Sequence, residues 1–344
     1  MAAISFFKPA LFRKDMDAVL QTMVDEKIGP GEKKRAFIKS MSLYLSKKDG
    51  VALRTYLDAI TISLKALNLN EGDCCALSVF TPTLYLDALK RLGIKPYLTD
   101  VSDDMLPSID EIKKGLDQGV KALVLFLPLG LVVQDGDSYK ELGLPIIEDV
   151  TQAIGSTFKG VKPGCVGDIV ICNTEEDAIV SSAGGALVLS DKDEIIEEVK
   201  KEVNSYSPYI ELPDLNASLG IVQLDKLDQI VLRRNTIYKL YFDEARKKNK
   251  VKVFGYGGVD FVPNGYGFSV VVNDRPDEVI QLALKYQVSL RKTFSKAIGA
   301  KYQDRYDRFP NAFPFLSRGV SFPLYPFLSN AEIQTVQKVI GILR

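Results

Sequence analysis

The sequence contains no histidine among its 344 residues. This absence excludes every mechanism that needs an imidazole as general base, including Ser-His-Asp and Cys-His nucleophilic catalysis. It also excludes all metal sites built on histidine ligands. Many classes of hydrolase and metalloenzyme are therefore ruled out before any motif is considered.

Net charge and long apolar runs are also missing. Lys plus Arg and Asp plus Glu each number 44, so no overall field would attract nucleic acid or an anionic membrane. The longest apolar runs, such as residues 122–130, are far too short to cross a bilayer. The chain begins with a few apolar residues followed by Lys8 and Arg13, which reverses the order of a secretory signal. We therefore expect a cytoplasmic protein that binds neither nucleic acid nor a membrane.

Cysteine is scarce, and its spacing is not that of a metal site. Three of the four cysteines lie in apolar, strand-like stretches. The pattern indicates buried free thiols in a reducing compartment. The four are Cys74, Cys75, Cys165 and Cys172.

Short apolar runs alternate with amphipathic stretches along the first two thirds of the chain. Strands and helices that alternate at this spacing predict a mainly parallel sheet covered on both faces. A helical region at 15–44 is broken at Gly29–Gly31. The expected strands are 74–80, 122–128, 145–148, 168–173 and 184–190, and the expected helices are 58–67, 84–92, 109–118 and 215–247.

The chain is long enough for two domains. Its composition changes at 246–252, a run rich in Lys and Arg that would suit a hinge. We therefore expect an N-terminal segment and large α/β domain over 1–245 and a smaller α+β domain over 246–344. In the smaller domain the patterns predict strands at 268–272 and 320–323 and helices at 277–286 and 330–343, the last capped by Ser329.

Ligands of open α/β sheets bind beyond the carboxyl ends of the strands. In this sequence those ends are 54–58, 80–83, 128–130, 149–152 and 173–183.

Several longer segments follow one another in a characteristic order. They are 4–9 (ISFFKP), 66–73 (ALNLNEGD), 92–101 (LGIKPYLTDV), 144–160 (LPIIEDVTQAIGSTFKG), the pairs Gly167-Asp168 and Gly184-Gly185, and then 216–227 and 318–326. Through them the sequence resembles the DegT/DnrJ/EryC1/StrS aminotransferases, which use pyridoxal phosphate (PLP) on nucleotide-linked keto sugars. The resemblance implies a fold-type-I PLP-transferase fold and a homodimer with sites at the subunit interface.

Two residues of the 144–160 segment match positions close to the cofactor in that family. Asp149 matches the carboxylate that pairs with the pyridine nitrogen and keeps the ring cationic. Gln152 matches a glutamine beside the cofactor. The alternative is that Asp149 caps the turn after its strand, with Gln152 packed beside it.

The lysine that carries the cofactor in the family is absent. It would fall at Glu176, Asp177 or Ala178, and no lysine occurs anywhere from 163 to 191. A lysine amine forms the imine with the aldehyde and then moves the proton. A carboxylate can do only the second, so we expect ordinary transamination to be lost.

The matching phosphate site is altered as well. Tyr56 replaces a glycine that lets the backbone approach the phosphate, and Cys172 or Asn173 replaces a serine. The stacking aromatic would fall near Pro82, and the neighbouring subunit's asparagine near Tyr209. We expect no covalent cofactor and little affinity for PLP or its amine form, pyridoxamine phosphate (PMP). The expected ligand cleft contains Tyr56, Asn173, Glu176 and Asp177.

The acidic run Glu175–Asp177 has two interpretations. It can be a solvated loop, or it can join Asp149 in binding a hard cation. Close to a bound phosphate it would be unfavourable, since one like-charge pair at ~4 Å costs roughly 4 kcal/mol at an effective dielectric of about 20.

Three other lysines are candidates for a migrated imine. Lys159 lies in the Phe-Lys-Gly turn, and Lys292 and Lys296 match a segment that borders the cleft in the family. The simpler interpretation is that all three are surface residues.

Two functions remain. The first is an aminotransferase-like protein without transaminase activity, reused as a binding or partner subunit. It would be a homodimer or a heterodimer with an active paralogue, with a sugar nucleotide as a possible ligand. The second is a lysine-independent PLP or PMP enzyme resembling the sugar dehydratases. In it Asp177 would act as base with a pKa raised by burial and by its acidic neighbours, and Asp149 would tune the ring.

Overall fold

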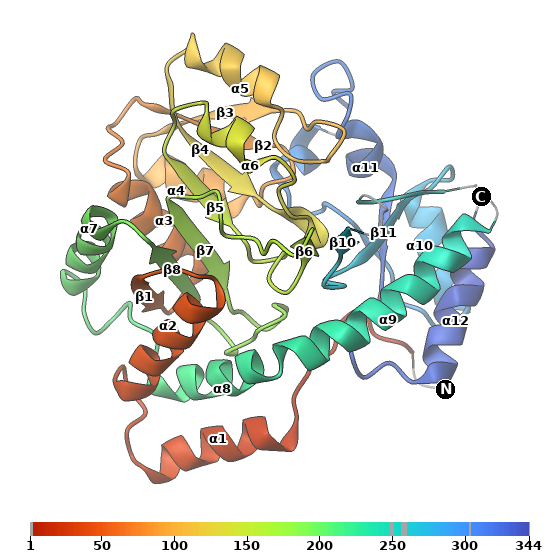
Figure 1. Cartoon of the computed structure of the whole chain (residues 1–344). Coiled ribbons are helices and arrows are strands. Elements are labelled where there is room, and N and C mark those ends of the chain that lie inside the picture. Colours follow the sequence, from red (N-terminus) through yellow and green to blue (C-terminus); the bar gives the residue numbers. More distant parts are fainter. Residues whose placement is uncertain (1–2, 248–250, 256–259, 303, 344) are drawn as a thin grey trace.

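The computed structural model describes residues 3–247, 251–255, 260–302 and 304–343. Its centre is a seven-stranded sheet in the order β1-β8-β7-β5-β4-β2-β3 (Figure 1). Neighbours from β7 to β3 run parallel, whereas β8 is antiparallel to both β7 and β1. The mainly parallel sheet expected from the sequence is confirmed. The strands are β1 (Asp49–Leu53), β2 (Cys74–Ser78), β3 (Lys95–Thr99), β4 (Val120–Phe126), β5 (Ile146–Asp149), β7 (Ile169–Asn173) and β8 (Ala186–Ser190).

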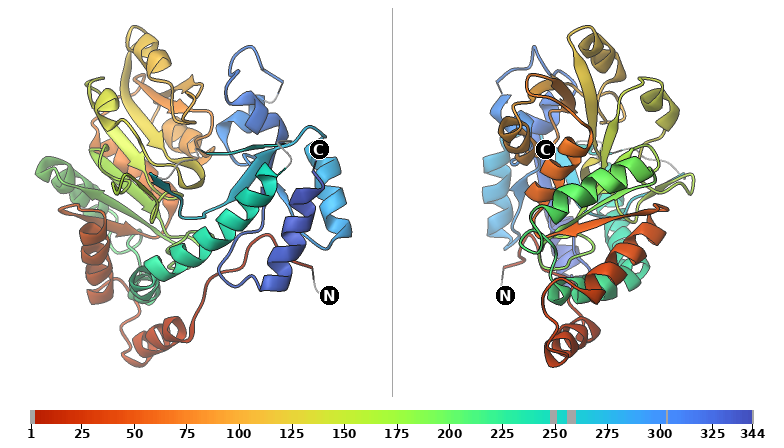
Figure 2. Two further views of the ribbon diagram at one scale, coloured as in Figure 1. Left: turned by 45° about the vertical axis from the view of Figure 1, so that its right-hand side comes forward. Right: turned by 90° about the vertical axis from the view of Figure 1, so that its left-hand side faces the viewer.

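Helices cover both faces of this sheet (Figures 1 and 2). Along each strand, successive side chains enter two different apolar clusters: Cys75 and Leu77 face one, and Ala76 faces the other. The first face is covered by α3 (Tyr56–Ala66), α4 (Leu84–Arg91) and α7 (Asp193–Asn204). The second is covered by α2 (Glu32–Tyr44), α5 (Ile109–Leu116), α6 (Gly136–Lys140), α8 (Asp214–Asp225) and the start of α9 (Leu227–Arg246), with α1 (Arg13–Val24) packed outside α8.

A smaller antiparallel sheet follows in the chain, in the order β12-β13-β11-β9. Its apolar side chains form a third cluster with α10, α12, the later part of α9 and Ile4. A two-stranded pair, β6 with β10, connects 157–158 to 261–262. The elements are β6 (Thr157–Phe158), β9 (Lys252–Val253), β10 (Phe261–Val262), β11 (Phe268–Val271), α10 (Pro276–Lys285), β12 (Arg291–Lys292), α11 (Phe313–Arg318), β13 (Gly319–Phe322) and α12 (Asn330–Gly341), with short 3-10 turns at Pro128–Gly130 and Ile298–Tyr302.

Ser329 caps α12 as the sequence predicts, since its side chain accepts from Glu332 N and Glu332 bonds back to Ser329 N. The single helix expected at 215–247 is wrong. Lys226 takes a non-helical backbone (φ −101°, ψ 2°) and separates α8 from α9. Its Nζ lies 2.9 Å from the carboxylate of Asp15 on α1. The break between α8 and α9 thus lies where Lys226 pairs with the Asp15 side chain of α1.

The two sheets are joined by an aromatic cluster and by backbone hydrogen bonds. Phe80, which follows β2, stacks on Phe294 with ring centroids 4.0 Å apart, and Phe254 and Phe315 pack edge-on around them. Beside them, residues 79–83 exchange backbone hydrogen bonds with 296–299. The domain boundary at 245/246 stays a prediction, and part of its expected hinge, 248–250, lies outside the described residues.

Membrane insertion finds no support in these helices. Within the described ranges, none combines the length and apolarity that crossing a bilayer requires.

Candidate functional site

Asp149 is the last residue of β5 and is completely buried. Its Oδ2 accepts hydrogen bonds from the hydroxyls of Tyr56 and Tyr85, the second at 2.6 Å. Its Oδ1 accepts from the backbone N–H of Thr151 at 3.0 Å. Both carboxylate oxygens therefore have donors from within the chain.

Local structure brings the two tyrosines to this carboxylate from different helices. Thr55 caps α3 by accepting from Asp58 N, which places Tyr56 in the first turn, beside the end of β5. Tyr85 lies in the first turn of α4, which follows β2. The rings meet edge to face with centroids 6.2 Å apart, and their exposed fractions are 7% and 0%. Two large rings fill the space in front of Asp149.

Burial dominates the electrostatics of this group. It raises the pKa of Asp149, and the hydrogen bonds from Thr151, Tyr56 and Tyr85 offset part of that shift. Burial and then the Asp149 charge raise the pKa of Tyr56 and Tyr85 well above the ordinary value. Both hydroxyls therefore stay protonated and serve as donors.

Gln152 lies half-buried beyond the end of β5 and binds a neighbouring turn. Its Oε1 accepts from the backbone N–H of Leu129 at 2.8 Å, where the backbone takes the left-handed value φ 50°. Its side chain also hydrogen-bonds with Tyr266. Burial raises the pKa of Tyr266, and the negative charge of Asp177 raises it further. Gln152 thus connects the turn after β4 to Tyr266.

The acidic run lies on the outside of the loop that follows β7. Glu175, Glu176 and Asp177 are exposed, while Ala178 is buried. Asn173, at the end of β7, points its Oδ1 at the backbone N–H of Glu175, 2.8 Å away. Of the expected cleft residues, Tyr56 donates a hydrogen bond to Asp149.

Asp149 and the acidic run, which together could bind a hard cation, lie in different surroundings. The carboxylate of Asp149 is buried among its hydrogen-bond donors, whereas the run faces solvent. Within the part of the chain that the structure describes, no three Cys, Asp or Glu side chains are grouped as a metal site would need.

The loop after β7 is closed by a tight turn before β8. Ser182 and Thr174 hydroxyls lie 2.7 Å apart, and Asn216 donates to the carbonyl of Ser182. Ala183, Gly184 and Gly185 all have positive φ. A Cβ on Gly185 would come within 2.8 Å of the carbonyl of Leu53, so only glycine fits there.

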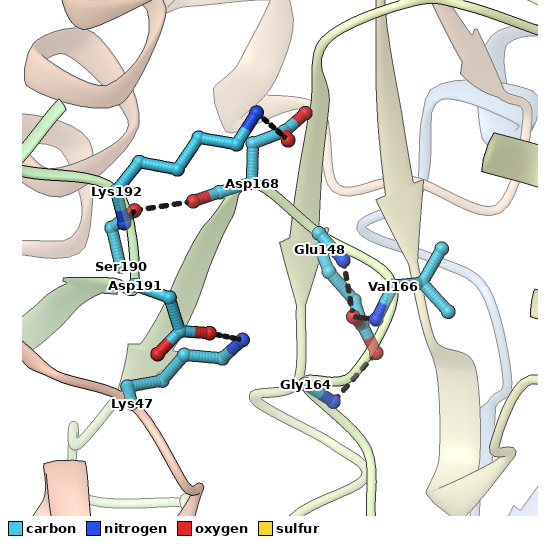
Figure 3. A network of polar contacts seen from close by, with 9 residues as sticks. Lys47, Glu148, Gly164, Val166, Asp168, Ser190, Asp191 and Lys192 are labelled. Atoms are coloured by element: carbon cyan, nitrogen blue, oxygen red, sulfur yellow. Dashed lines mark hydrogen bonds and ion pairs between the residues drawn. The ribbon is translucent and has the colours of Figure 1, made fainter. Parts of the chain in front are cut away.

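No lysine side chain of the expected set approaches Asp149. Lys159 and Lys296 are exposed, and Lys292 pairs with Asp277 at 2.9 Å. Lys192, the first lysine after this loop, pairs with Asp168 at 2.6 Å, at the opposite end of β7 (Figure 3).

Glu148, the residue before Asp149, is equally buried and has a different environment. It accepts backbone N–H bonds from Gly164 at 2.7 Å and from Val166 and Gly167 at 2.8 Å each (Figure 3). Sequence reasoning singled out neither Glu148 nor Tyr85. Tyr85 lies close to Pro82, just after β2, but a position near a strand end does not by itself distinguish a site residue from a core residue.

Two surface hollows lie away from Asp149 and its tyrosines. One, of about 320 Å³, lies between α1 and the N-terminus of α2. The other, of about 360 Å³, follows the edge strand β3. Neither is lined by Asp149, Tyr56 or Tyr85.

Comparison with known proteins agrees with the resemblance. The chain is 24% identical to the spore coat polysaccharide biosynthesis protein SpsC of Bacillus subtilis, over 95% of this chain and 94% of SpsC. It is 26% identical to the UDP-4-amino-4,6-dideoxy-N-acetyl-beta-L-altrosamine transaminase of Campylobacter jejuni, over 72% of this chain and 70% of that one.

Among solved structures, the putative sugar aminotransferase Spr1654 of Streptococcus pneumoniae in its PLP form superposes with a TM-score of 0.89. It is 20% identical, and the match covers 98% of both chains. The DegT/DnrJ/EryC1/StrS aminotransferase family itself matches residues 10–341. This chain, with its fold-type-I architecture and its tyrosine-bound Asp149, therefore belongs to the DegT/DnrJ/EryC1/StrS aminotransferase family.

Proposed function

We propose that this chain is a family member without transaminase activity that acts as a binding or partner subunit. The observation that carries the proposal is the absence of any lysine from 163 to 191. The acidic run at the corresponding place faces solvent and offers carboxylates only. Because a carboxylate cannot form an imine with an aldehyde, the first step of ordinary transamination has no nucleophile.

The surroundings of Asp149 support the same proposal. PLP needs an accessible carboxylate for its ring nitrogen, but Asp149 is 0% exposed and both its oxygens are hydrogen-bonded to groups of the chain. The residues present do not fit the cofactor in its usual pose. We therefore propose that the folded chain does not depend on PLP or PMP.

A partner role is supported by α1, which turns polar residues inward. Asp15 and Thr22 are each 1% exposed, while the apolar residues on the other side of the helix face solvent. This is the reverse of an ordinary surface helix, and exposed apolar stripes of this kind mark protein interfaces. The stripe consists of Met16, Leu20, Met23 and Val24, which are 55%, 58%, 55% and 75% exposed.

We propose that a second subunit of the same fold covers this stripe, either another copy or an active paralogue. The names of the relatives suggest the setting: one is a spore coat polysaccharide biosynthesis protein and another acts on a UDP-linked amino sugar. By this analogy we propose a role in nucleotide-sugar or surface-polysaccharide metabolism, in the cytoplasm.

Absorbance tests the loss of chemistry directly. The protein is incubated with PLP or PMP, desalted, treated with borohydride and scanned, with Spr1654 as a PLP-binding control. We expect no retained band and no amino transfer to a nucleotide-linked keto sugar. A stoichiometric PMP band would favour the lysine-independent enzyme with Asp177 as base. A borohydride-reducible PLP adduct would contradict the proposal.

Sedimentation tests the partner role. Replacing Leu20 and Met23 together with glutamate should turn a dimer into a monomer, because two charges would be placed in the buried stripe. Leu284→Glu, at a 45% exposed position on α10, is the matched control and should leave the dimer intact. A monomeric wild type would contradict pairing between two copies, and co-purification with a lysine-bearing paralogue would then test the second form of the proposal.

A further inference from the structure

The strand β3, at the edge of the seven-stranded sheet, has one side of its backbone open. Within the described residues, β2 is its only partner strand. The N–H of Lys95 and the carbonyl of Thr99 are both hydrogen-bonded on the β2 side. Because successive residues of a strand direct their backbone groups to opposite edges, Pro96 and Leu98 direct theirs to the open side.

This open stretch is short, because both of its ends are closed to further pairing. The N–H of Asp100, next in the alternation, donates to the carboxylate of Glu111 at 2.6 Å, and the carbonyl of Asp100 accepts from Ser108 N–H at 3.0 Å. At the other end, Pro96 has no N–H. The open edge therefore offers one donor, the N–H of Leu98, and two acceptors, the carbonyls of Pro96 and Leu98. A strand that paired here would be fixed in register by the single donor.

The hollow of about 360 Å³ follows this open stretch and adds apolar surface to it. Tyr97 and Leu98 line it from β3, Lys114 lines it from α5, and Arg308 and Phe309 line it from beyond the 3-10 turn at 298–302. Tyr97 and Leu98 are half-buried, and Phe309 is buried. We call the hollow and the open backbone of Pro96–Leu98 together the β3 groove.

The charges that line the β3 groove do not balance. Lys114 and Arg308 are both exposed. Arg308 lies over the rings of Tyr302 and Phe309, 5.3 and 5.0 Å from their centroids. Glu111, the one carboxylate among the lining residues, already accepts a backbone hydrogen bond. The groove is therefore complementary to acidic side chains.

We propose that the β3 groove binds an acidic segment of a partner protein in extended conformation, which adds to the sheet as an eighth strand. The backbone of this segment would donate to the carbonyls of Pro96 and Leu98 and accept from the N–H of Leu98. Its carboxylates would pair with Lys114 and Arg308.

A second copy of this chain is disfavoured as the occupant, because pairing β3 with itself would bring like charges together. The β3 groove also lies at the opposite end of the molecule from α1 (Figures 1 and 2). Its occupant is therefore independent of the subunit proposed to cover the α1 stripe.

Peptide binding to the full chain tests the charge complementarity. The probe is a fluorescently labelled peptide, acetyl-Glu-Val-Glu-Val-Glu-amide, and its dissociation constant is measured by anisotropy. The double variant Lys114→Glu/Arg308→Glu should weaken binding by about tenfold, because both groove charges are reversed. The matched control, Lys113→Glu/Lys301→Glu, changes the net charge equally at exposed positions outside the hollow and should bind as the wild type does.

N-methylation of the peptide tests the addition of a strand. In an added strand, alternate N–H groups face β3 and the others face solvent. Methyl groups on one alternating set of peptide nitrogens should weaken binding by about tenfold, since the hydrogen bonds to the carbonyls of Pro96 and Leu98 are lost. Methyl groups on the other set should be tolerated. Association by charge alone would not distinguish the two sets.

Three results would overturn the inference: no binding of the acidic peptide up to millimolar concentration, equal affinity of the two double variants, or equal affinity of the two methylated peptides. Sedimentation of Lys114→Glu/Arg308→Glu tests the other occupant, since a changed oligomeric state would assign the β3 groove to a second copy and also overturn the inference. The proposed function is decided separately, by cofactor spectra, amino transfer and the variants of α1.

Discussion

Two adjacent carboxylates at the end of β5, those of Glu148 and Asp149, have contrasting surroundings. Glu148 and Asp149 are both 0% exposed and their side chains leave the strand on opposite faces. Glu148 is held by three backbone N–H groups of 164–167, whereas Asp149 is held mainly by two side-chain hydroxyls. Backbone donors survive substitution of their residues, but side-chain donors do not. The Glu148 region is therefore built into the fold, and the Asp149 region is open to change one residue at a time.

The largest loss of stability is expected for Glu148→Ala, which tests this contrast directly. It would leave the N–H groups of Gly164, Val166 and Gly167 buried without an acceptor, and we expect a loss of roughly 3–6 kcal/mol in the free energy of unfolding. Urea unfolding measures it. Glu148→Gln, which keeps an acceptor oxygen, should lose clearly less. A loss below about 1 kcal/mol for the alanine variant would show that the loop does not depend on this carboxylate.

Tyr85→Ala should cost somewhat less, about 3–4 kcal/mol, because it removes a buried ring and leaves a cavity. The same urea experiment measures it, with Tyr139→Ala as a control at a buried site where the hydroxyl donates to the carbonyl of Pro107. If Tyr85→Ala were nearly neutral, the ring would not be packed as described.

Removal of the hydroxyl alone is a finer test. Tyr85→Phe keeps the ring but takes one donor from Asp149, and we expect a loss of about 2 kcal/mol, as for a hydrogen bond to a charged group. Tyr139→Phe, whose hydroxyl meets an uncharged carbonyl, should lose about 1 kcal/mol. Equal losses would mean that Asp149 carries no charge at the pH of the measurement.

The smallest effect is expected from pH. Burial raises the pKa of Asp149 in the folded protein above its ordinary value of 3.8, so the folded state holds this proton more tightly than the unfolded chain does. Stability from this group is greatest below 3.8 and falls as pH rises through the window up to the raised pKa.

Asp149→Asn removes that dependence. The wild type should therefore lose stability relative to the variant as pH rises through this window. Thermal unfolding of both proteins at matched pH values measures the difference. If the wild type instead became more stable relative to the variant as pH rises, the hydrogen bonds would outweigh burial and the pKa of Asp149 would be lowered.

Much of the fold could be predicted because apolar runs and helical spacing are local signals. The strand β3 was not predicted, because Lys95 and Pro96 are exposed on an edge strand and interrupt the apolar run. The break at Lys226 coincides with a contact to Asp15, 211 residues away in the chain. No local pattern carries such information.

The candidate site, like the fold, could be predicted from the sequence only in part. Asp149 and Tyr56 lie in matched family segments and could be singled out. Tyr85 could not, because a tyrosine in the first turn of an amphipathic helix is typical of any core. Its role depends on the contact with Asp149, 64 residues away. The exposure of Glu176 and Asp177 agrees with the solvated-loop interpretation of the acidic run, whereas the closure of that loop at Gly184 and Gly185 is seen only in the folded chain.

The stacked phenylalanines between the two sheets have a consequence for how the protein can be divided. Phe80 follows β2 of the first sheet, while Phe254, Phe294 and Phe315 all come from the chain beyond residue 246, and all four are at most 7% exposed. A polypeptide truncated before residue 246 would leave Phe80 without its ring partners and the end of β2 without its backbone hydrogen bonds. We therefore expect the parts of the chain before and after residue 246 to unfold together, and an expressed N-terminal fragment to aggregate through the newly exposed Phe80.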